Sequence, residues 1–99
     1  MYTISINNTI PNQAFDGLQI KQLVKNQKFE ILSISLAKNA VFPPHESNED
    51  AHLIMLQGKI VFYIEDNPIN LMELQEFSFP KHTEHWVEAL ENSKFLILR

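Results

Sequence analysis

The chain has 99 residues and a formal net charge of −4 at pH 7, with 44% hydrophobic and 20% charged residues. This length fits one domain, and the composition is that of a folded protein rather than a disordered one. The eight lysine and arginine residues are scattered among twelve acidic ones, which argues against a nucleic-acid partner. The absence of cysteine excludes disulfides and thiolate metal sites.

The first residues of the chain predict no membrane targeting. Residues 1–7 lack the basic stretch and long apolar run that mark a signal peptide. No apolar run in the sequence approaches the ~20 residues needed to cross a bilayer. We therefore expect no membrane partner and a cytoplasmic location.

The N-terminal part of the sequence differs from the rest in its periodicity. Residues 1–16 hold few periodic apolar positions, so we expect an N-terminal arm or a strand exchanged between subunits. Residues 17–99 are then expected to form a single β domain.

Apolar residues that alternate with other residues predict strands over most of this domain. Leu32, Ile34 and Leu36 alternate with serines, and breakers such as Gln57-Gly58 and Asp66-Asn67-Pro68 separate such runs. The pattern predicts about eight short strands, with turns at the spacing of an all-β sandwich or barrel. Parallel βαβ units are excluded because the chain leaves no room for helical crossovers.

Two histidines stand at the entry to short apolar runs. His45 follows the rigid, extended Pro43-Pro44, and His85 begins a strand whose Val87 and Ala89 share its face. Imidazole is the commonest side-chain metal ligand and the usual proton shuttle near neutral pH. Together they predict a pocket for a small molecule or a metal, while a surface loop histidine and a hydrogen-bonded core histidine are the alternative interpretations.

The spacing around these histidines resembles the two motifs of the cupin superfamily, a family of small jelly-roll barrels. The first motif, G-x5-H-x-H-x3,4-E-x6-G, places its first histidine on His45 and its last glycine on Gly58. The second, G-x5-P-x-G-x2-H-x3-N, places its proline on Pro80 and its histidine on His85. The resemblance covers residues 30–99 and implies an all-β, single-domain cupin-type jelly-roll β-barrel.

The chain departs from the family pattern at two metal-ligand positions. Ser47 replaces the second histidine of the first motif, and Ala51 replaces its glutamate. Relatives that hold a divalent metal usually do so with three histidines and this glutamate, so the resemblance leaves only His45 and His85 as metal ligands.

A third ligand would be needed for a firmly held metal, because zinc sites use at least three protein ligands. It would come from His82, Glu49 or Asp50, since His52 is expected to face the opposite side of its strand. The resemblance thus implies at most a weak site for a divalent transition metal, namely Fe, Mn, Ni or Zn.

Other residues are expected to complete a ligand-binding pocket. Phe62 and Phe79 are predicted to line the interior as apolar walls, with a purely structural core role as the alternative. Ser47 keeps its position small and polar, so it is predicted either to bind a ligand or to cap the turn of the 46–50 loop. The three acids of that loop predict a mouth that gathers cations, or simply a solvated loop.

Two runs, residues 53–56 and 95–98, are apolar on both strand faces. An outer face that stays apolar must be covered, and we expect a second subunit to cover it, with the N-terminal arm as the alternative. Trp86, which is expected to point away from His85, is predicted to lie at a subunit contact. The predicted partners are therefore a second copy of the chain and a small-molecule ligand.

Three functions follow from these expectations. The first is binding of a small polar metabolite in the barrel mouth, with at most a weak metal site. The second is a metal-dependent enzyme of the isomerase or dioxygenase type that uses His45 and His85 as ligands. The third is a degenerate, non-catalytic scaffold that acts through its dimer surface.

Overall fold

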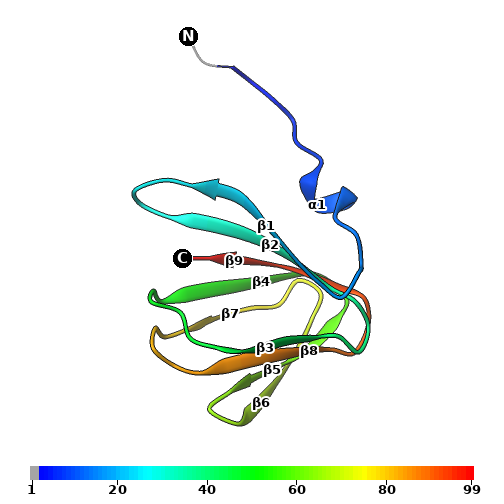
Figure 1. The fold of residues 1–99 in the computed structure, drawn as a ribbon, viewed down its shortest axis with the longest axis vertical. Helices are drawn as coiled ribbons and strands as arrows, with labels where there is room; N and C mark the ends of the chain where they lie inside the picture. Colours follow the sequence, from blue (N-terminus) through cyan, green and yellow to red (C-terminus); the bar gives the residue numbers. More distant parts are fainter. Residues whose placement is uncertain (1–2) are drawn as a thin grey trace.

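The structure, a computed structural model, describes residues 3–99 as two facing β-sheets preceded by one short helix (Figure 1). Nine strands lie in this part of the chain, which confirms the all-β prediction. The elements are α1 Thr9–Asn12, β1 Leu18–Lys25, β2 Glu30–Leu36, β3 Val41–His45, β4 Ala51–Gln57, β5 Lys59–Ile64, β6 Asn67–Met72, β7 Glu76–Phe79, β8 His85–Ala89 and β9 Ser93–Leu98. No helix among the described residues is long and apolar enough to span a membrane.

The strands form two antiparallel sheets. Sheet A has the order β1-β2-β9-β4-β7, and sheet B has the order β3-β8-β5-β6. Strands distant in sequence are therefore neighbours, as in the pairing of β3 with β8 and of β2 with β9. This topology brings His45 and His85 onto adjacent strands of sheet B.

The core lies between the inner faces of the two sheets. Along β4 the side chains of Ala51, Leu53 and Met55 are buried, whereas His52 and Ile54 between them are only half-buried. This alternation is the period of two that a pleated strand imposes. The largest side chains that are almost completely buried are those of Phe62, Phe95, Ile34, Leu36, Leu53, Met55, Ile60 and Val87.

Gly58 closes the turn between β4 and β5 in a conformation that favours glycine. Its φ is 86°, and an added Cβ would collide with the carbonyl oxygen of Asn92 and with Oγ of Ser93. The Ser93 hydroxyl also accepts a hydrogen bond of 3.1 Å from the backbone N–H of Lys59. The turn is thus packed directly against the β8–β9 turn, where no side chain fits.

Residues 3–8 extend away from the sheets (Figure 1). The side chains of Ile4 and Ile6 are 82% and 89% exposed, and α1 follows them. The division into an arm of residues 1–16 and a β domain of residues 17–99 stays a prediction, as does the exchange of a strand between subunits.

The second half of the arm is fixed to the outer face of sheet A. The buried side-chain amide of Gln13 donates to the Ser33 carbonyl at 2.9 Å, and Ser33 Oγ lies 2.6 Å from Gln13 Oε1, to which it donates. Lys94 Nζ donates to the carbonyl of Ile10 at 2.7 Å. The chain thus covers one end of this face itself, around β2 and β9.

Candidate functional site

The two histidines predicted to converge lie side by side. His45 ends β3 and His85 begins β8, and the two residues are direct register partners. Their ring centroids are 4.1 Å apart, with an angle of 65° between the ring planes. The topology of sheet B therefore produces an imidazole pair at one end of the barrel.

His85 is the more enclosed member of the pair, with only 3% of its surface exposed. Its ring stacks on Phe62 at 5.3 Å between centroids, and Phe79 lies 4.7 Å away. Burial lowers the pKa of His85 below its usual 6.5, although a hydrogen bond to the Thr83 carbonyl opposes this effect. The positive charges that His45 and Arg99 can carry lower this pKa further. His85 is therefore neutral near pH 7.

His45 is held from its other side. Its ring stacks on Phe42 at 4.4 Å and 17°. The register between β3 and β8 shifts between Phe42 and His45, where the two prolines stand. This irregularity aims the imidazole toward His85.

The hydrogen bonds of the two rings define which nitrogens are free. Nδ1 of His45 lies 2.7 Å from the carbonyl of Pro43, and Nδ1 of His85 lies 2.9 Å from the carbonyl of Thr83. A carbonyl only accepts hydrogen bonds, so each Nδ1 carries the proton and donates it. In the neutral rings both Nε2 atoms therefore keep a lone pair that can accept a hydrogen bond or coordinate a metal.

A cavity of about 30 Å³ opens between these rings. This volume is close to the share of one water molecule in liquid water, so it admits one small polar group. The cavity is lined by Leu32, Ile34, Phe42, His45, Phe62, His85, Val87, Phe95, Ile97 and Arg99.

Arg99 is a member of this site that the sequence analysis missed. It continues the inward-facing series of Phe95 and Ile97 by one more step of two residues, and this spacing could have identified it. Its Nε donates to Oε1 of Glu30 at 2.8 Å. The bond from Arg99, followed by one from Gln22, lowers the pKa of Glu30 below its usual 4.5.

Phe62 and Phe79 occupy the predicted interior positions. They are 1% and 3% exposed, and their ring centroids lie 5.0 Å apart. Phe62 lines the cavity directly, whereas Phe79 contacts His85 from behind. Both belong to the hydrophobic core, so a structural role and a wall role coincide for Phe62. Phe79 lines the hollow beside His52 instead, so its predicted place in the wall of the imidazole cavity is wrong.

Ser47 does not line the cavity, although its side chain is 3% exposed. Its Oγ accepts a hydrogen bond of 3.2 Å from the backbone N–H of Glu49. This bond is the turn-capping arrangement that was the alternative interpretation for this residue. Contact between Ser47 and a ligand stays a prediction.

The predicted third metal ligands are not gathered around the imidazole pair. Oδ1 of Asp50 accepts a hydrogen bond from the backbone N–H of Lys81 at 2.9 Å. His82 is exposed in the β7–β8 turn, with a φ of 60°, and Glu49 lines a different hollow. Within residues 3–99, no three histidine, aspartate or glutamate side chains form a group that could hold a metal. These residues therefore fit a tightly bound metal poorly, because two imidazoles leave the ligand set incomplete.

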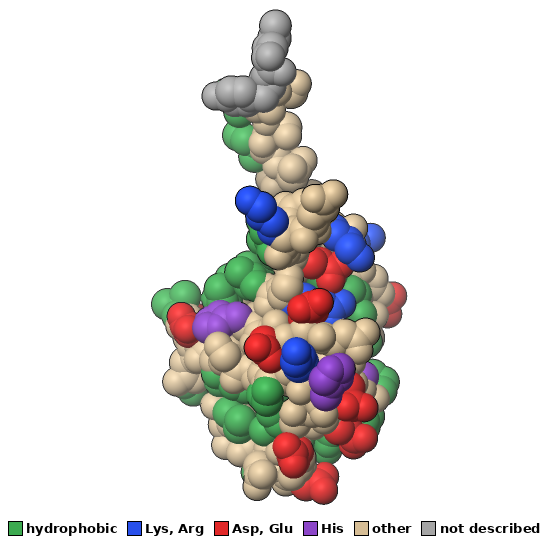
Figure 2. Space-filling model, turned by 90° about the vertical axis from the view of Figure 1, so that its left-hand side faces the viewer, with side chains coloured by type: hydrophobic (Ala, Val, Ile, Leu, Met, Phe, Trp, Pro, Cys, Tyr) green, Lys and Arg blue, Asp and Glu red, His purple; other side chains and the backbone are tan. Residues whose placement is uncertain are grey.

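A polar hollow of about 320 Å³ adjoins the imidazole cavity. Arg99 lines both spaces and so lies between them. The hollow is lined by Lys25, Asn26, Gln27, Lys28, Phe29, Glu30, Glu49 and Arg99. Figure 2 faces the side of the molecule where the C-terminus lies in Figure 1, and it shows basic, acidic and histidine side chains interspersed there.

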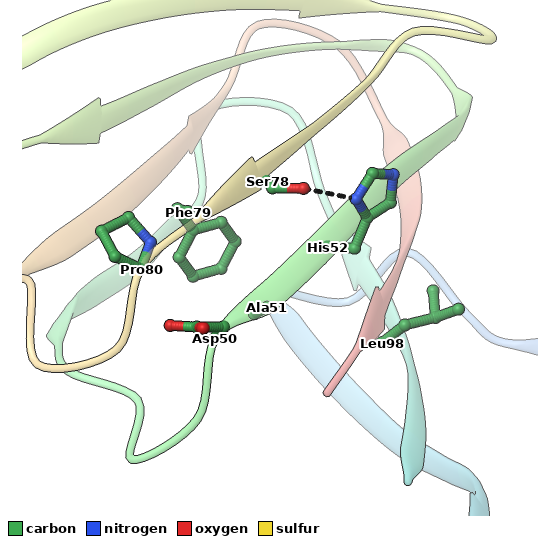
Figure 3. A pocket seen from close by; sticks show the side chains of 7 residues that line it. All are labelled: Asp50, Ala51, His52, Ser78, Phe79, Pro80 and Leu98. Atoms are coloured by element: carbon green, nitrogen blue, oxygen red, sulfur yellow. Dashed lines mark hydrogen bonds between the residues drawn. The ribbon is translucent and has the colours of Figure 1, made fainter.

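A larger hollow, of about 500 Å³, lies on the other side of β4 (Figure 3). Its lining includes His52, whose Nδ1 lies 2.7 Å from Ser78 Oγ and whose Nε2 lies 2.8 Å from Oε1 of Glu76. His52 thus faces away from the imidazole pair, as predicted. The hollow shares no lining residue with the imidazole cavity, so its greater size does not make it part of that site.

Solved structures with the same fold are numerous. An RmlC-like cupin protein from Desulfovibrio desulfuricans superposes with a TM-score of 0.85 at 21% identity, over 97% of this chain and 95% of that one. KdgF from a Halomonas species gives a TM-score of 0.74 at 25% identity, over 83% of this chain and 78% of that one. An RmlC-like cupin family protein with a double-stranded β-helix fold from Methanocaldococcus jannaschii gives 0.78 at 25% identity, over 89% and 83%.

Comparisons by sequence add nothing to this likeness. No protein-family model matches the chain, and no curated protein matches it either. The likeness to known proteins therefore lies in the three-dimensional arrangement of the strands.

Proposed function

We propose that this chain, which has the fold of the cupin superfamily, binds a small polar metabolite at the barrel mouth, between His45 and His85. The observation that carries this proposal is the hydrogen-bonding state of the pair. Both Nδ1 atoms are bonded to backbone carbonyls, so both Nε2 atoms are left to accept from a ligand. Two acceptors beside each other in a cavity whose other lining residues, apart from Arg99, are apolar suit a hydroxyl or N–H group.

The apolar surroundings increase the selectivity of such a contact. Phe42 and Phe62 stack on the two imidazoles, and a polar group that enters without making hydrogen bonds would lose its hydration there. Since the cavity holds about one small group, the rest of the ligand extends from it toward the hollow beyond Arg99.

Metal binding is secondary in this proposal. His45 and His85 could coordinate Fe, Mn, Ni or Zn through Nε2, but with two protein ligands such a site is weak. A metal-dependent isomerase or dioxygenase would need a third ligand, and no described side chain supplies one beside the pair.

We also propose that the chain forms a homodimer through the outer face of sheet A. Half-buried apolar side chains lie together on this face because β9 pairs with both β2 and β4, which makes Leu98 a partner of Ile31, and Leu96 a partner of Ile54. Leu56 continues the row. We call these five residues the outer apolar face.

A second copy is the occupant that this face suits best. The chain's own arm covers only the end near Lys94, and it leaves Ile4 and Ile6 exposed beyond the sheet. Exposed isoleucines at alternate positions of an extended arm can add to the surface that a second subunit covers. If the protein is a non-catalytic scaffold, it would act through the surface of this homodimer.

The test of the binding proposal uses histidine side-chain NMR on protein prepared without a polyhistidine tag. Glycerol, sorbitol and glucose serve as probes, and elemental analysis of the same preparation measures bound metal. We expect the Nε2 resonances of His45 and His85 to shift on addition of a binding probe. His85→Phe should abolish the response, whereas His52→Phe, on the opposite face of β4, should retain it. A response that survives His85→Phe, or one confined to His52, would refute the proposal.

A further inference from the structure

We infer that the metabolite is a small hydroxylated carboxylate whose acid group is bound by Arg99 in the polar hollow. This inference rests on the proposed function, because it assigns the ligand of the same mouth. It adds Arg99 to the binding residues and assigns the ligand a negative charge, neither of which follows from the histidine pair alone.

The position of Arg99 is the first reason. Its side chain lines the imidazole cavity on one side and the 320 Å³ hollow on the other. It also lies close enough to His85 for its charge to lower the pKa of that imidazole. A ligand that reaches from the histidine pair into the hollow must therefore pass the guanidinium group.

The hydrogen bonds of Arg99 leave it able to bind an anion. Its Nε donates to Glu30, and within residues 3–99 no hydrogen bond engages either of its Nη atoms. The side chain is 33% exposed, so these donors are accessible. A guanidinium with free Nη–H groups can bind a carboxylate with paired hydrogen bonds.

The charges around the hollow favour an anion as well. Lys25, Lys28 and Arg99 contribute three cations, while Glu30 and Glu49 contribute two carboxylates. Glu30 is already occupied, because it accepts hydrogen bonds from Arg99 and Gln22. Lys25 Nζ also lies 3.9 Å from Oε2 of Glu30, so Arg99 and Lys25 share this carboxylate. The three cations of the hollow still exceed its two carboxylates by one, which favours an anionic ligand.

The histidine pair requires a second group on the ligand. Its Nε2 atoms are acceptors, so they bind a hydroxyl rather than a carboxylate oxygen, which would repel their lone pairs. A hydroxyl in the small cavity and an acid group beyond Arg99 together describe a hydroxy acid or a sugar acid. An uncharged sugar would leave the Nη donors of Arg99 without an anionic partner.

The alternative is that Arg99 only stabilises the sheet end. Its backbone N–H and carbonyl also pair with those of Glu30, so the ion pair could serve merely to join β9 to β2. The two roles make different predictions, because a structural ion pair does not distinguish an acid from the corresponding sugar.

The experiment measures the affinities of gluconate, lactate and glucose by titration, with the same histidine NMR readout. We expect gluconate to bind more tightly than glucose, and Arg99→Gln to weaken gluconate on the order of tenfold to a hundredfold, a clearly larger factor than its effect on glucose. Arg99→Lys, which keeps the charge but not the planar fork, should give a smaller loss. Lys38→Gln removes the same charge from an exposed turn outside the hollow and should change neither affinity.

The possible outcomes separate the two proposals. If glucose and gluconate bind alike, and Arg99→Gln and Arg99→Lys leave both affinities unchanged, the carboxylate inference is overturned while metabolite binding at the histidines stands. If no probe shifts His45 or His85, the proposed function fails and the carboxylate inference fails with it. Loss of gluconate binding in Lys38→Gln as well would show a diffuse charge effect and would also overturn the role of Arg99.

Discussion

His85 and His52 show how two faces of the same barrel give one residue type different properties. His85 points inward, is 3% exposed and lies among aromatic rings. His52 points outward from β4, where it is held by the hydroxyl of Ser78 and the carboxylate of Glu76. Within residues 3–99 the first imidazole keeps one nitrogen without a hydrogen-bond partner, in a mostly apolar cavity, and the second has both nitrogens occupied.

The comparison shows that chemical availability depends on hydrogen bonding more than on exposure. Both nitrogens of His52 have side-chain partners, although this residue is only half-buried. Among the described residues the Nε2 of the nearly buried His85 has no partner, since the hydrogen bond of this ring to the Thr83 carbonyl uses Nδ1. An acceptor that is enclosed and unoccupied is more selective than a solvated one, since water competes less with a ligand.

The largest effect on stability should come from Phe62, which lies beside His85 in the inner site. Phe62→Ala removes a 1% exposed ring that stacks on His85, and we expect unfolding in urea to show a loss of about 3–5 kcal/mol. Phe29→Ala, at a 45% exposed position, should cost less than about 1 kcal/mol. Equal losses in the two variants would contradict the view that the inner region carries the core.

A charge placed in the outer apolar face should change the oligomeric state of the protein. Leu96→Glu places a charge in its centre, and we expect sedimentation or light scattering to show monomers where the unaltered protein forms dimers. Leu90→Glu, at a 44% exposed position in the β8–β9 turn, is the matched control and should leave the dimer intact. A monomeric parent protein would exclude the homodimer.

The pH dependence of stability should be smaller in size but specific to the inner histidine. Because the folded-state pKa of His85 lies below its usual 6.5, the unfolded chain takes up this proton first as the pH falls. Its contribution to stability is therefore complete above pH 6.5 and is lost as the pH falls toward the folded-state pKa.

Urea unfolding between pH 5 and 8 would measure this dependence. His85→Phe should flatten the decline in the free energy of unfolding below pH 6.5. The range from pH 5 to 8 lies above the titration of Glu30, because the pKa of that carboxyl is lowered below 4.5. His45 and Arg99 face His85, so the difference between the two proteins also includes their coupling to it. An unchanged slope would mean that His85 is solvated in solution.

The smallest effect should come from the outer histidine network. Ser78→Ala removes one exposed hydrogen bond from His52, and the free energy of unfolding should change by less than about 1 kcal/mol. A loss above about 2 kcal/mol would show that this network is buried in the assembled protein. That result would place the hydrogen-bond network of His52 in the dimer contact rather than on the solvated surface.

Local sequence patterns predicted much of the fold. The alternation of Leu32, Ile34 and Leu36 with serines specified which side of that strand faces the core, because the pleat has a period of two. The same rule correctly turned His52 outward and His85 inward. Gly58 marked a turn because its φ of 86° is one that glycine adopts freely.

Contacts between distant strands were beyond these local patterns. The sequence contained Arg99 and Glu30, yet only the pairing of β2 with β9 brings them together, 69 positions apart. Side-chain hydrogen bonds to backbone carbonyls decided which imidazole nitrogens stay free, and Asp50 is bonded to Lys81 rather than turned toward the histidine pair. The sequence by itself therefore determined the strands, their buried sides and the histidine positions, since these depend on neighbouring residues. The tertiary structure alone decided which side chains share a cavity and which hydrogen-bond partners they keep, since these depend on how the strands are ordered in the two sheets.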